Sequence, residues 1–145
     1  MSRENVTTWG LDLLTERIIG CVINTHRILG PGFLESVYQR ALLIELAEEG
    51  LRAEAEKEIR IHYKGQDVGI HKIDILVEDE IVVELKAVEE LIGAHYGQVK
   101  AYLKASGKQL GLLVNFSGAR SDTRRIEWSE SRSYRKTTGL EEARG

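Results

Sequence analysis

The sequence lacks several features that would each indicate a particular class of protein. Its single cysteine, Cys21, excludes an intrachain disulfide, a four-cysteine zinc site and a cysteine-held iron–sulfur cluster. No apolar run approaches the length of a membrane span, and the first residues lack the apolar core of a secretory signal. We therefore expect a cytoplasmic protein without a membrane partner, which fits a chain almost free of cysteine.

An excess of charge of one sign is also missing. The chain has 20 Lys and Arg residues against 23 Asp and Glu residues, a formal net charge of -3. This balance excludes a polycation that binds nucleic acid indiscriminately. It leaves open an enzyme with an acidic metal site, because such residues count toward the total. With 145 residues and 42% hydrophobic content, the chain is long enough for one domain with a buried core.

The spacing of apolar residues predicts a mixed α/β domain. Helices are expected where apolar residues recur every three or four positions, and strands where they alternate or run continuously. The predicted elements are helices over residues 12–29 and 33–50, strands over 59–63, 68–77 and 81–88, a helix over 89–106 and a strand over 110–116. Gly30, Pro31 and Gly32 end the first helix, because these residue types do not continue one.

The composition changes after Phe116, where the sequence becomes polar and mixes arginines with acidic residues. We expect a solvated extension or a short extra helix there, rather than a nucleic-acid-binding arm, because acids interrupt the bases. The expected organisation is a flexible N-terminus over 1–10, one domain over 11–118 and a polar extension over 119–145. A homodimer through the first helix or the C-terminal residues is left open, since no sequence feature indicates one.

The hairpin from Ile73 to Lys86 carries charged residues inside apolar strands. Asp74, Glu84 and Lys86 interrupt an otherwise aliphatic run. A carboxylate in a buried strand costs several kcal/mol unless it is paired, hydrogen-bonded or bound to a metal. Two explanations follow: an ion pair between Lys86 and one of the acids, or a metal site built from both acids.

The metal explanation depends on the register of this hairpin. A three-residue turn over 78–80 would pair Val77 with Ile81, and so would place Asp74 opposite Glu84 on one face. A two-residue turn would place the two carboxylates on opposite faces. Strict alternation along the strand also places Asp74 on the face of Val68, Ile70, Lys72 and Leu76.

Four motifs appear in order along the chain. The first is Gly32-Phe33-Leu34-Glu35-Ser36-Val37-Tyr38, and the second combines Asp74 with Glu84-Leu85-Lys86. The third is Gln98-Val99-Lys100-Ala101-Tyr102, and the fourth is Val114-Asn115-Phe116. Together they resemble the GxxExxY protein family, a small bacterial and archaeal branch of the PD-(D/E)XK nuclease superfamily. The third motif resembles the QxxxY motif of RecB-like nucleases. Ile73 stands where the superfamily name has proline, and many members share that departure.

The resemblance implies a restriction-endonuclease-like fold, a mixed α+β sheet with an α-β-β-β-α-β core and an extra N-terminal helix. It also implies hydrolysis of nucleic acid with Mg2+ or Mn2+. Asp74 and Glu84 are then the metal ligands, with the Leu85 backbone carbonyl as a third. Glu35 is a further candidate ligand, although spacing alone favours a charge at the positive end of a helix.

The remaining site residues are assigned by the same resemblance. Lys86 would position the attacking water or stabilise developing charge. Gln98 and Tyr102 would orient the phosphate or a catalytic side chain, with ordinary helix packing as the alternative. For His95, a packed helix residue is favoured over a general acid. The expected substrate is DNA, with RNA as the alternative. The competing functions are a non-cleaving nucleic-acid-binding or regulatory module and an assembly subunit.

Overall fold

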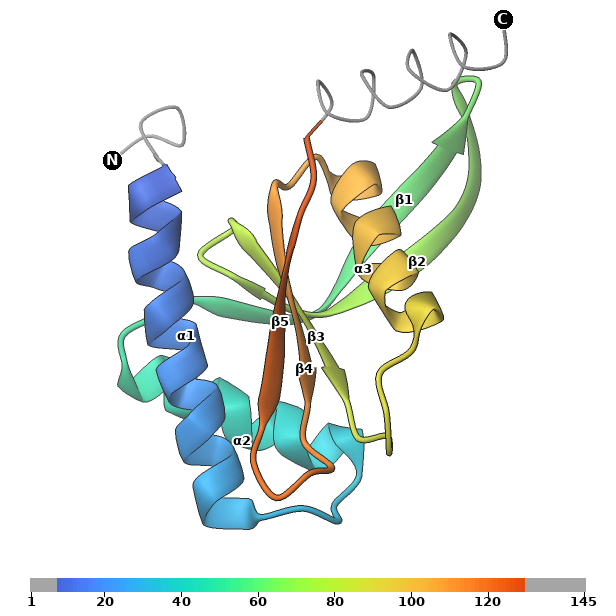
Figure 1. Ribbon diagram of the computed structural model, residues 1–145. Helices are drawn as coiled ribbons and strands as arrows, with labels where there is room; N and C mark the ends of the chain where they lie inside the picture. The colour runs from blue at the N-terminus through green and yellow to red at the C-terminus, as the bar shows by residue number, and fades with distance from the viewer. Residues whose placement is uncertain (1–7, 130–145) are drawn as a thin grey trace, which may run out of the picture.

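Eight elements build the part of the chain that this computed structural model describes, residues 8–129. They are α1 (Thr8–Leu29), α2 (Glu35–Glu48), β1 (Ala53–Tyr63), β2 (Gln66–Val77), β3 (Ile81–Lys86), α3 (Gly93–Ser106), β4 (Leu110–Asn115) and β5 (Asp122–Glu127). The strands form one sheet in the order β1-β2-β3-β4-β5, in which β3 and β4 are parallel and all other neighbours antiparallel (Figure 1). This order confirms the expected α-β-β-β-α-β core, α2 to β4, preceded by an extra helix.

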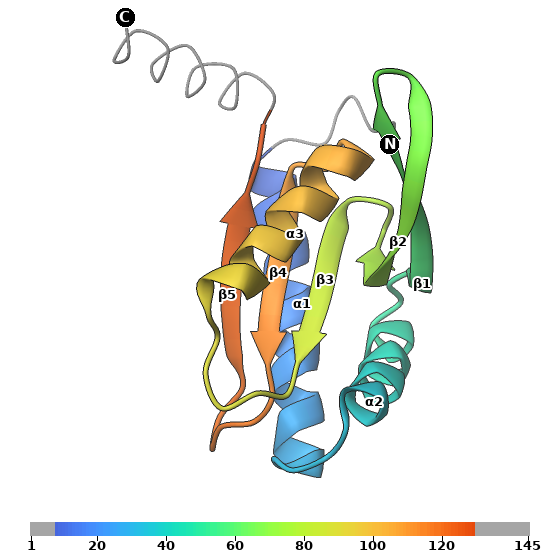
Figure 2. The same ribbon diagram turned by 90° about the vertical axis from the view of Figure 1, so that its right-hand side faces the viewer.

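Helices cover both faces of the sheet. α1 and α2 pack on one face, where Ile18, Leu42 and Phe116 belong to one buried cluster with residues of β3 and β4. α3 packs on the other face through Val99 and Leu103 (Figure 2). Every residue of β4 is buried, which explains its continuous apolar sequence. No helix within residues 8–129 has the length and apolar character needed to cross a bilayer.

Gly111 allows α3 to approach β4 closely. A β-carbon at this position would lie 2.6 Å from Val99 Cγ1 and 3.6 Å from Leu103 Cδ1. Gly111→Ala is therefore expected to lower the free energy of unfolding by about 1–3 kcal/mol, the usual effect of overpacking. Urea unfolding measures this change.

Gly20→Ala is the matched control for the Gly111 variant. Gly20 is exposed in α1, and a β-carbon added there has no atom within 4 Å. Because alanine is the better helix residue, the control should stabilise the protein by up to about 1 kcal/mol. Wild-type stability of Gly111→Ala would contradict the close packing of α3 on β4.

The outer parts of the sheet differ from the prediction. β1 begins at Ala53 rather than at residue 59. Its first half is polar and has no apolar pattern to predict a strand, but it pairs with the buried half of β2. Residues 122–127 form a strand beside β4, not a solvated extension or a helix. Ile126 is the only fully buried residue of β5, so this edge strand has little apolar pattern. α3 begins at Gly93, after residues 89–92.

Parts of two predicted terminal segments lie outside the described residues. The expected flexible N-terminus covered residues 1–10, and residues 1–7 are not described, whereas α1 begins at Thr8. The expected polar extension covered residues 119–145, and residues 130–145 are not described. Only its first part, with β5, can be compared with the structure.

The β2–β3 hairpin has the register that the metal hypothesis requires. Val77 pairs with Ile81, and the ladder continues over the next two pairs. The turn contains three residues, Glu78, Asp79 and Glu80, and the first two have φ of 52° and 56°. The Glu80 N–H closes the turn by donating to the Val77 carbonyl at 2.9 Å. The prediction of a three-residue turn is confirmed.

Both ladders of β2 are interrupted at Asp74. The β1–β2 pairing omits Glu56 and Asp74, and Glu56 has φ of 54°. Ile75 packs in the cluster under α1 and α2, whereas Ile73 packs in the cluster under α3. The alternation of side chains therefore changes at Asp74, so residues 68, 70 and 72 do not share one face with Leu76, and the expectation of strict alternation along this strand is wrong. Irregularities of this kind redirect a side chain.

Candidate functional site

The interruption of β2 directs the Asp74 carboxylate at β3. Asp74 Oδ2 accepts a hydrogen bond from the Leu85 N–H at 2.8 Å. Gln39 of α2 holds the irregular strands, since its Nε2 donates to the Asp74 carbonyl at 2.9 Å and to Glu56 Oε1 at 3.0 Å. The N–H and C=O of one strand residue point to the same side, so the Leu85 carbonyl faces the same opening as Asp74.

Glu84 is an almost fully buried carboxylate beside Asp74. It is 4% exposed, and no hydrogen-bond partner among residues 8–129 reaches its Oε2. Burial raises the pKa of Glu84 to about 9, and its hydrogen bond with the Asp74 carboxyl and the charge of Asp74 act in the same direction. The charge of Lys86 opposes them. A buried oxygen without a partner requires an explanation, and a bound cation would supply one.

The oxygen atoms of this site match the requirements of a hard divalent cation. Mg2+ commonly binds one or two carboxylates and keeps several waters for itself or for substrate phosphate. Among the described residues, no three His, Cys, Asp or Glu side chains converge closely enough to hold a metal ion. The pair of Asp74 and Glu84 supplies oxygen ligands for a divalent cation that keeps part of its water shell.

Glu35 and Asp74 line the same pocket. This open pocket is lined by Glu35, Gln39, Glu56, Asp74 and Leu85, together with Ser36. Glu35 Oε1 accepts a hydrogen bond from the Ala87 N–H at 3.3 Å, so the start of α2 contacts the chain just after β3. The negative charge of Glu35 also raises the pKa of Glu84. Carboxylates from α2, β1 and β2 thus line one pocket.

Tyr38 fixes the start of α2 and therefore the position of Glu35. Its hydroxyl donates to the Gly30 carbonyl at 2.6 Å and accepts from the Phe33 N–H at 3.3 Å. Its ring stacks on Phe116 with a centroid distance of 4.3 Å and an interplanar angle of 1°. The connection between α1 and α2 also passes through Gly32 at φ of 107°, a conformation that favours glycine.

α3 brings Tyr102 near the carboxylate pair, and Gln98 of the same helix contacts Tyr102. Tyr102 is 5% exposed. Burial raises the pKa of the Tyr102 hydroxyl, the charges of Glu84 and Asp74 raise it further, and a hydrogen bond with Gln98 opposes them. His95 has a structural role, because its Nδ1 accepts a hydrogen bond from the Ile92 N–H at 3.0 Å and caps the helix. This capping role differs both from the packed role favoured for His95 and from a general acid.

Lys86 is half-buried at the end of β3, on the same face as Glu84. Within residues 8–129 it forms no ion pair with Asp74 or Glu84, so the ion-pair explanation of the hairpin is not observed. Asn115 fixes the chain after Lys86, since its Nδ2 donates to the Val88 carbonyl at 2.8 Å and its Oδ1 accepts from the Val88 N–H at 3.1 Å.

Sequence reasoning assigned no site role to Gln39, Glu56 or Asn115. Gln39 follows Glu35 by four positions, so helical spacing was a usable signal. Asn115 interrupts an apolar strand, which was a second signal. Glu56 lies among alternating charges at the start of β1, and nothing in that pattern indicates its positive φ.

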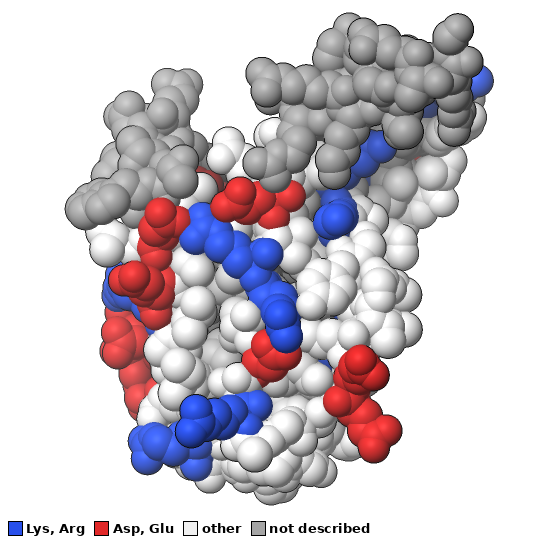
Figure 3. All heavy atoms as spheres, in the orientation of Figure 1, with Lys and Arg blue, Asp and Glu red and all other residues white. Residues whose placement is uncertain are grey.

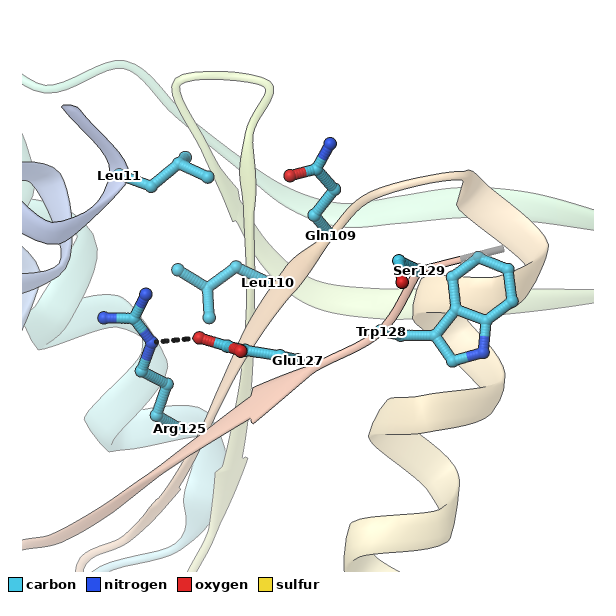
Figure 4. A pocket seen from close by; sticks show the side chains of 7 residues that line it. All are labelled: Leu11, Gln109, Leu110, Arg125, Glu127, Trp128 and Ser129. Atoms are coloured by element: carbon cyan, nitrogen blue, oxygen red, sulfur yellow. Dashed lines mark hydrogen bonds and ion pairs between the residues drawn. The ribbon is translucent and has the colours of Figure 1, made fainter. Parts of the chain in front are cut away.

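A different pocket lies at the opposite end of β4, where Leu11, Leu110 and Trp128 contribute to its lining (Figure 4). Its two charged residues, Arg125 and Glu127, form an ion pair at 3.1 Å, and Arg125 also contacts Asp12 at 2.6 Å. Positive and negative side chains are interleaved over this side of the molecule (Figure 3). Among the described residues, Glu127 is the one carboxylate that lines this pocket, and its charge is paired with Arg125.

The fold and the carboxylate site together define a restriction-endonuclease-like domain. The chain belongs to the PD-(D/E)XK nuclease superfamily, whose sequence model matches residues 12–126. The superfamily resemblance is thereby confirmed, and it supports a nuclease that acts on nucleic acid.

Solved structures share this fold. A protein named SSO0001 is 23% identical with a TM-score of 0.53, over 73% of this chain and 58% of that chain. An alkaline exonuclease, LHK-Exo from Laribacter hongkongensis, is 15% identical with a TM-score of 0.51, over 95% of this chain and 77% of that chain. This chain therefore spans little more than half of SSO0001. No curated protein matches the sequence.

Proposed function

We propose that the protein is a nuclease of the GxxExxY branch that hydrolyses phosphodiester bonds of DNA with Mg2+ or Mn2+. The observation that carries the proposal is the buried Glu84 carboxylate, whose Oε2 has no partner within the described residues, beside Asp74. A cytoplasmic location and the division into one nuclease domain with short terminal segments remain parts of this proposal.

Asp74, Glu84 and the Leu85 carbonyl would hold the cation, and Glu35 would contact it or a second ion from across the pocket. When bound, the cation supplies Lewis acidity to the scissile phosphate and to the attacking water. Asp74 is suited to this role because the Leu85 N–H fixes its Oδ2 at 2.8 Å. A ligand held in place before binding loses little conformational freedom when the ion arrives.

Lys86, Gln98 and Tyr102 would act on the substrate. The Lys86 ammonium is close enough to influence Glu84 and is not held in an ion pair with it. It would donate to the attacking water or to a phosphate oxygen that gains negative charge. Gln98 would hold the Tyr102 hydroxyl through their hydrogen bond, and both would orient the phosphate from α3.

The branch assignment is supported by the segment from Gly32 to Tyr38. Gly32 has the positive φ that the connection requires, Tyr38 holds that connection through Gly30, and Glu35 opens α2 beside the pocket. Gly32, Glu35 and Tyr38, the residues that name the branch, thus each have a separate structural role where α1 connects to α2.

The direct test is cleavage of linear, circular and single-stranded DNA, and of RNA, by the wild-type protein. We expect cleavage of DNA with Mg2+ or Mn2+, complete loss with a chelator and recovery when the cation is restored. A protein that binds oligonucleotides after chelation but cleaves none under any cation would instead be the non-cleaving module. Stronger cleavage of RNA than of DNA would correct the substrate. Glu48→Gln, at an exposed position of α2, is the control variant and should cleave like wild type.

A further inference from the structure

A groove separates α3 from the β1–β2 hairpin, which extends beside that helix in Figure 1. Arg60, His62 and His71 contribute to its lining from the hairpin, and Tyr102 and Lys104 from the helix. The rest of the lining is apolar: one isoleucine of β1 and two alanines of α3. The small alanine side chains leave room between helix and hairpin.

Tyr102 connects the groove to the carboxylate site. It lines the groove and packs in one cluster with Val82 of β3, the strand that carries Glu84, and the charges of Glu84 and Asp74 act on its hydroxyl. The exposed His71 ring lies next to it, with a centroid distance of 5.7 Å and an interplanar angle of 49°. A strand whose phosphate lies at the carboxylates could therefore continue past Tyr102 to His71.

The charges of the two regions differ in sign. The pocket at the carboxylates is lined by Glu35, Glu56 and Asp74, whereas no acidic residue among residues 8–129 lines the groove. Arg60 is partly neutralised by Asp67 at 2.7 Å. Lys104 is exposed and forms no ion pair with another described residue. In a chain with a net charge of -3, this groove is a favourable place for a polyanion.

We propose that this groove binds a single strand of nucleic acid next to the scissile phosphate, with a backbone phosphate beside Lys104 and a base against the His71 ring. The proposal rests on the proposed nuclease function and adds the path and the form of its substrate. A single strand is favoured because its unstacked bases can use the apolar lining and an exposed ring. A duplex would present mainly phosphates and sugars.

The test is the affinity of a fluorescent single-stranded oligonucleotide, measured by anisotropy over a range of salt with Ca2+ in place of Mg2+. Lys104→Ala should weaken binding and lower the slope of log Kd against log salt by about 0.7, the value for one phosphate contact on a single strand. His71→Ala should weaken binding by roughly 5- to 100-fold, the usual range for a lost base-stacking contact. His71→Phe keeps an aromatic ring and should retain most of the affinity.

Two controls separate this groove from general charge effects. Lys100 is exposed on α3 one turn before Lys104, and Lys72 is exposed on β2 next to His71; neither lines the groove. Alanine at either position should leave the affinity and the salt slope unchanged. The same oligonucleotide as a duplex, and as RNA, distinguishes the form and the type of nucleic acid.

Failure of the groove proposal can be distinguished from failure of the proposed nuclease function. Wild-type affinity of both Lys104→Ala and His71→Ala would overturn the groove, even if the carboxylate variants lose cleavage. Equal loss in the Lys100 and Lys72 controls would overturn it as well, and so would loss confined to the duplex. Absence of cleavage by the wild type, with binding that depends on His71 and Lys104, would overturn the nuclease and keep the groove.

Discussion

Glu84→Gln is expected to abolish nuclease activity and to make the metal-free protein more stable. Cleavage should fall by at least about 1000-fold, because a metal ion contributes several kcal/mol of transition-state stabilisation. Stability should rise at neutral pH, because the buried Glu84 carboxyl has a pKa of about 9 and lies beside the Asp74 carboxylate. At neutral pH the folded state must keep a proton on Glu84 that the unfolded chain releases, and a neutral amide avoids that cost.

The sign of the stability effect follows from proton binding. The pKa of Glu84 is raised from 4.5 in the unfolded reference to about 9 in the folded protein. Between these two pH values, the folded state therefore holds a proton on Glu84 that the unfolded chain releases. The stability linked to this proton is fully present below pH 4.5 and is lost as the pH rises toward 9. At neutral pH, Glu84→Gln should gain on the order of 1–3 kcal/mol with a chelator present.

Urea unfolding of wild type and Glu84→Gln, at acidic and neutral pH with chelator, measures this effect. The free energy of unfolding of the wild type should fall from acidic to neutral pH, and that of the variant should fall less. Mg2+ should raise the unfolding temperature of wild type but not of the variant. Glu48→Gln, on exposed α2 surface, should follow wild type in every measurement. Full nuclease activity of Glu84→Gln would exclude the proposed role of the carboxylate.

Lys86→Gln is expected to lose about 100- to 1000-fold in cleavage, the usual loss when one charge-stabilising group is removed. The binding of Mg2+ should persist, because Lys86 contributes no ligand and its removal leaves Asp74 and Glu84 in place. Single-turnover cleavage and calorimetric titration with Mg2+ measure the two properties separately.

Lys72→Gln is the matched control for Lys86→Gln, since Lys72 is exposed on the neighbouring strand. It should cleave at the wild-type rate. If Lys86→Gln failed to bind Mg2+, the lysine would be needed to assemble the site rather than to act on the substrate. Wild-type cleavage by Lys86→Gln would remove it from the reaction.

The sequence predicted the parts of the site that depend on chain connectivity. The three turn residues over 78–80 determine the register of β2 and β3, and side-chain alternation then puts Glu84 and Lys86 on one face. The helix after the hairpin returns across that face, which brings Tyr102 toward the carboxylates. These inferences need only the lengths of loops and the periods of helix and strand.

The remaining parts of the site depend on contacts between segments that are distant in the sequence. The periodicity of apolar residues carries no information about such contacts. The change of face at Asp74 requires the positive φ of Glu56, a residue with no special preference for that conformation. β5 pairs with β4 along its whole length through backbone hydrogen bonds, and such bonds are independent of side-chain pattern. Helical spacing from Glu35 could have indicated Gln39 as a site residue. No sequence pattern indicates that Gln39 contacts the Asp74 carbonyl.

The stack of Tyr38 on Phe116 has a consequence for how the enzyme is made. Every residue proposed for the reaction precedes Leu110, yet Glu35 is positioned through Tyr38, whose ring packs on Phe116 at 4.3 Å. His26 of α1 stacks on the same ring at 6.2 Å and contacts the Gly118 carbonyl at 2.9 Å. A nascent chain that ends before β4 thus carries all of the chemistry without the aromatic partner that aligns it. Catalytic competence should therefore arise only after Phe116 has left the ribosome and can pack against Tyr38.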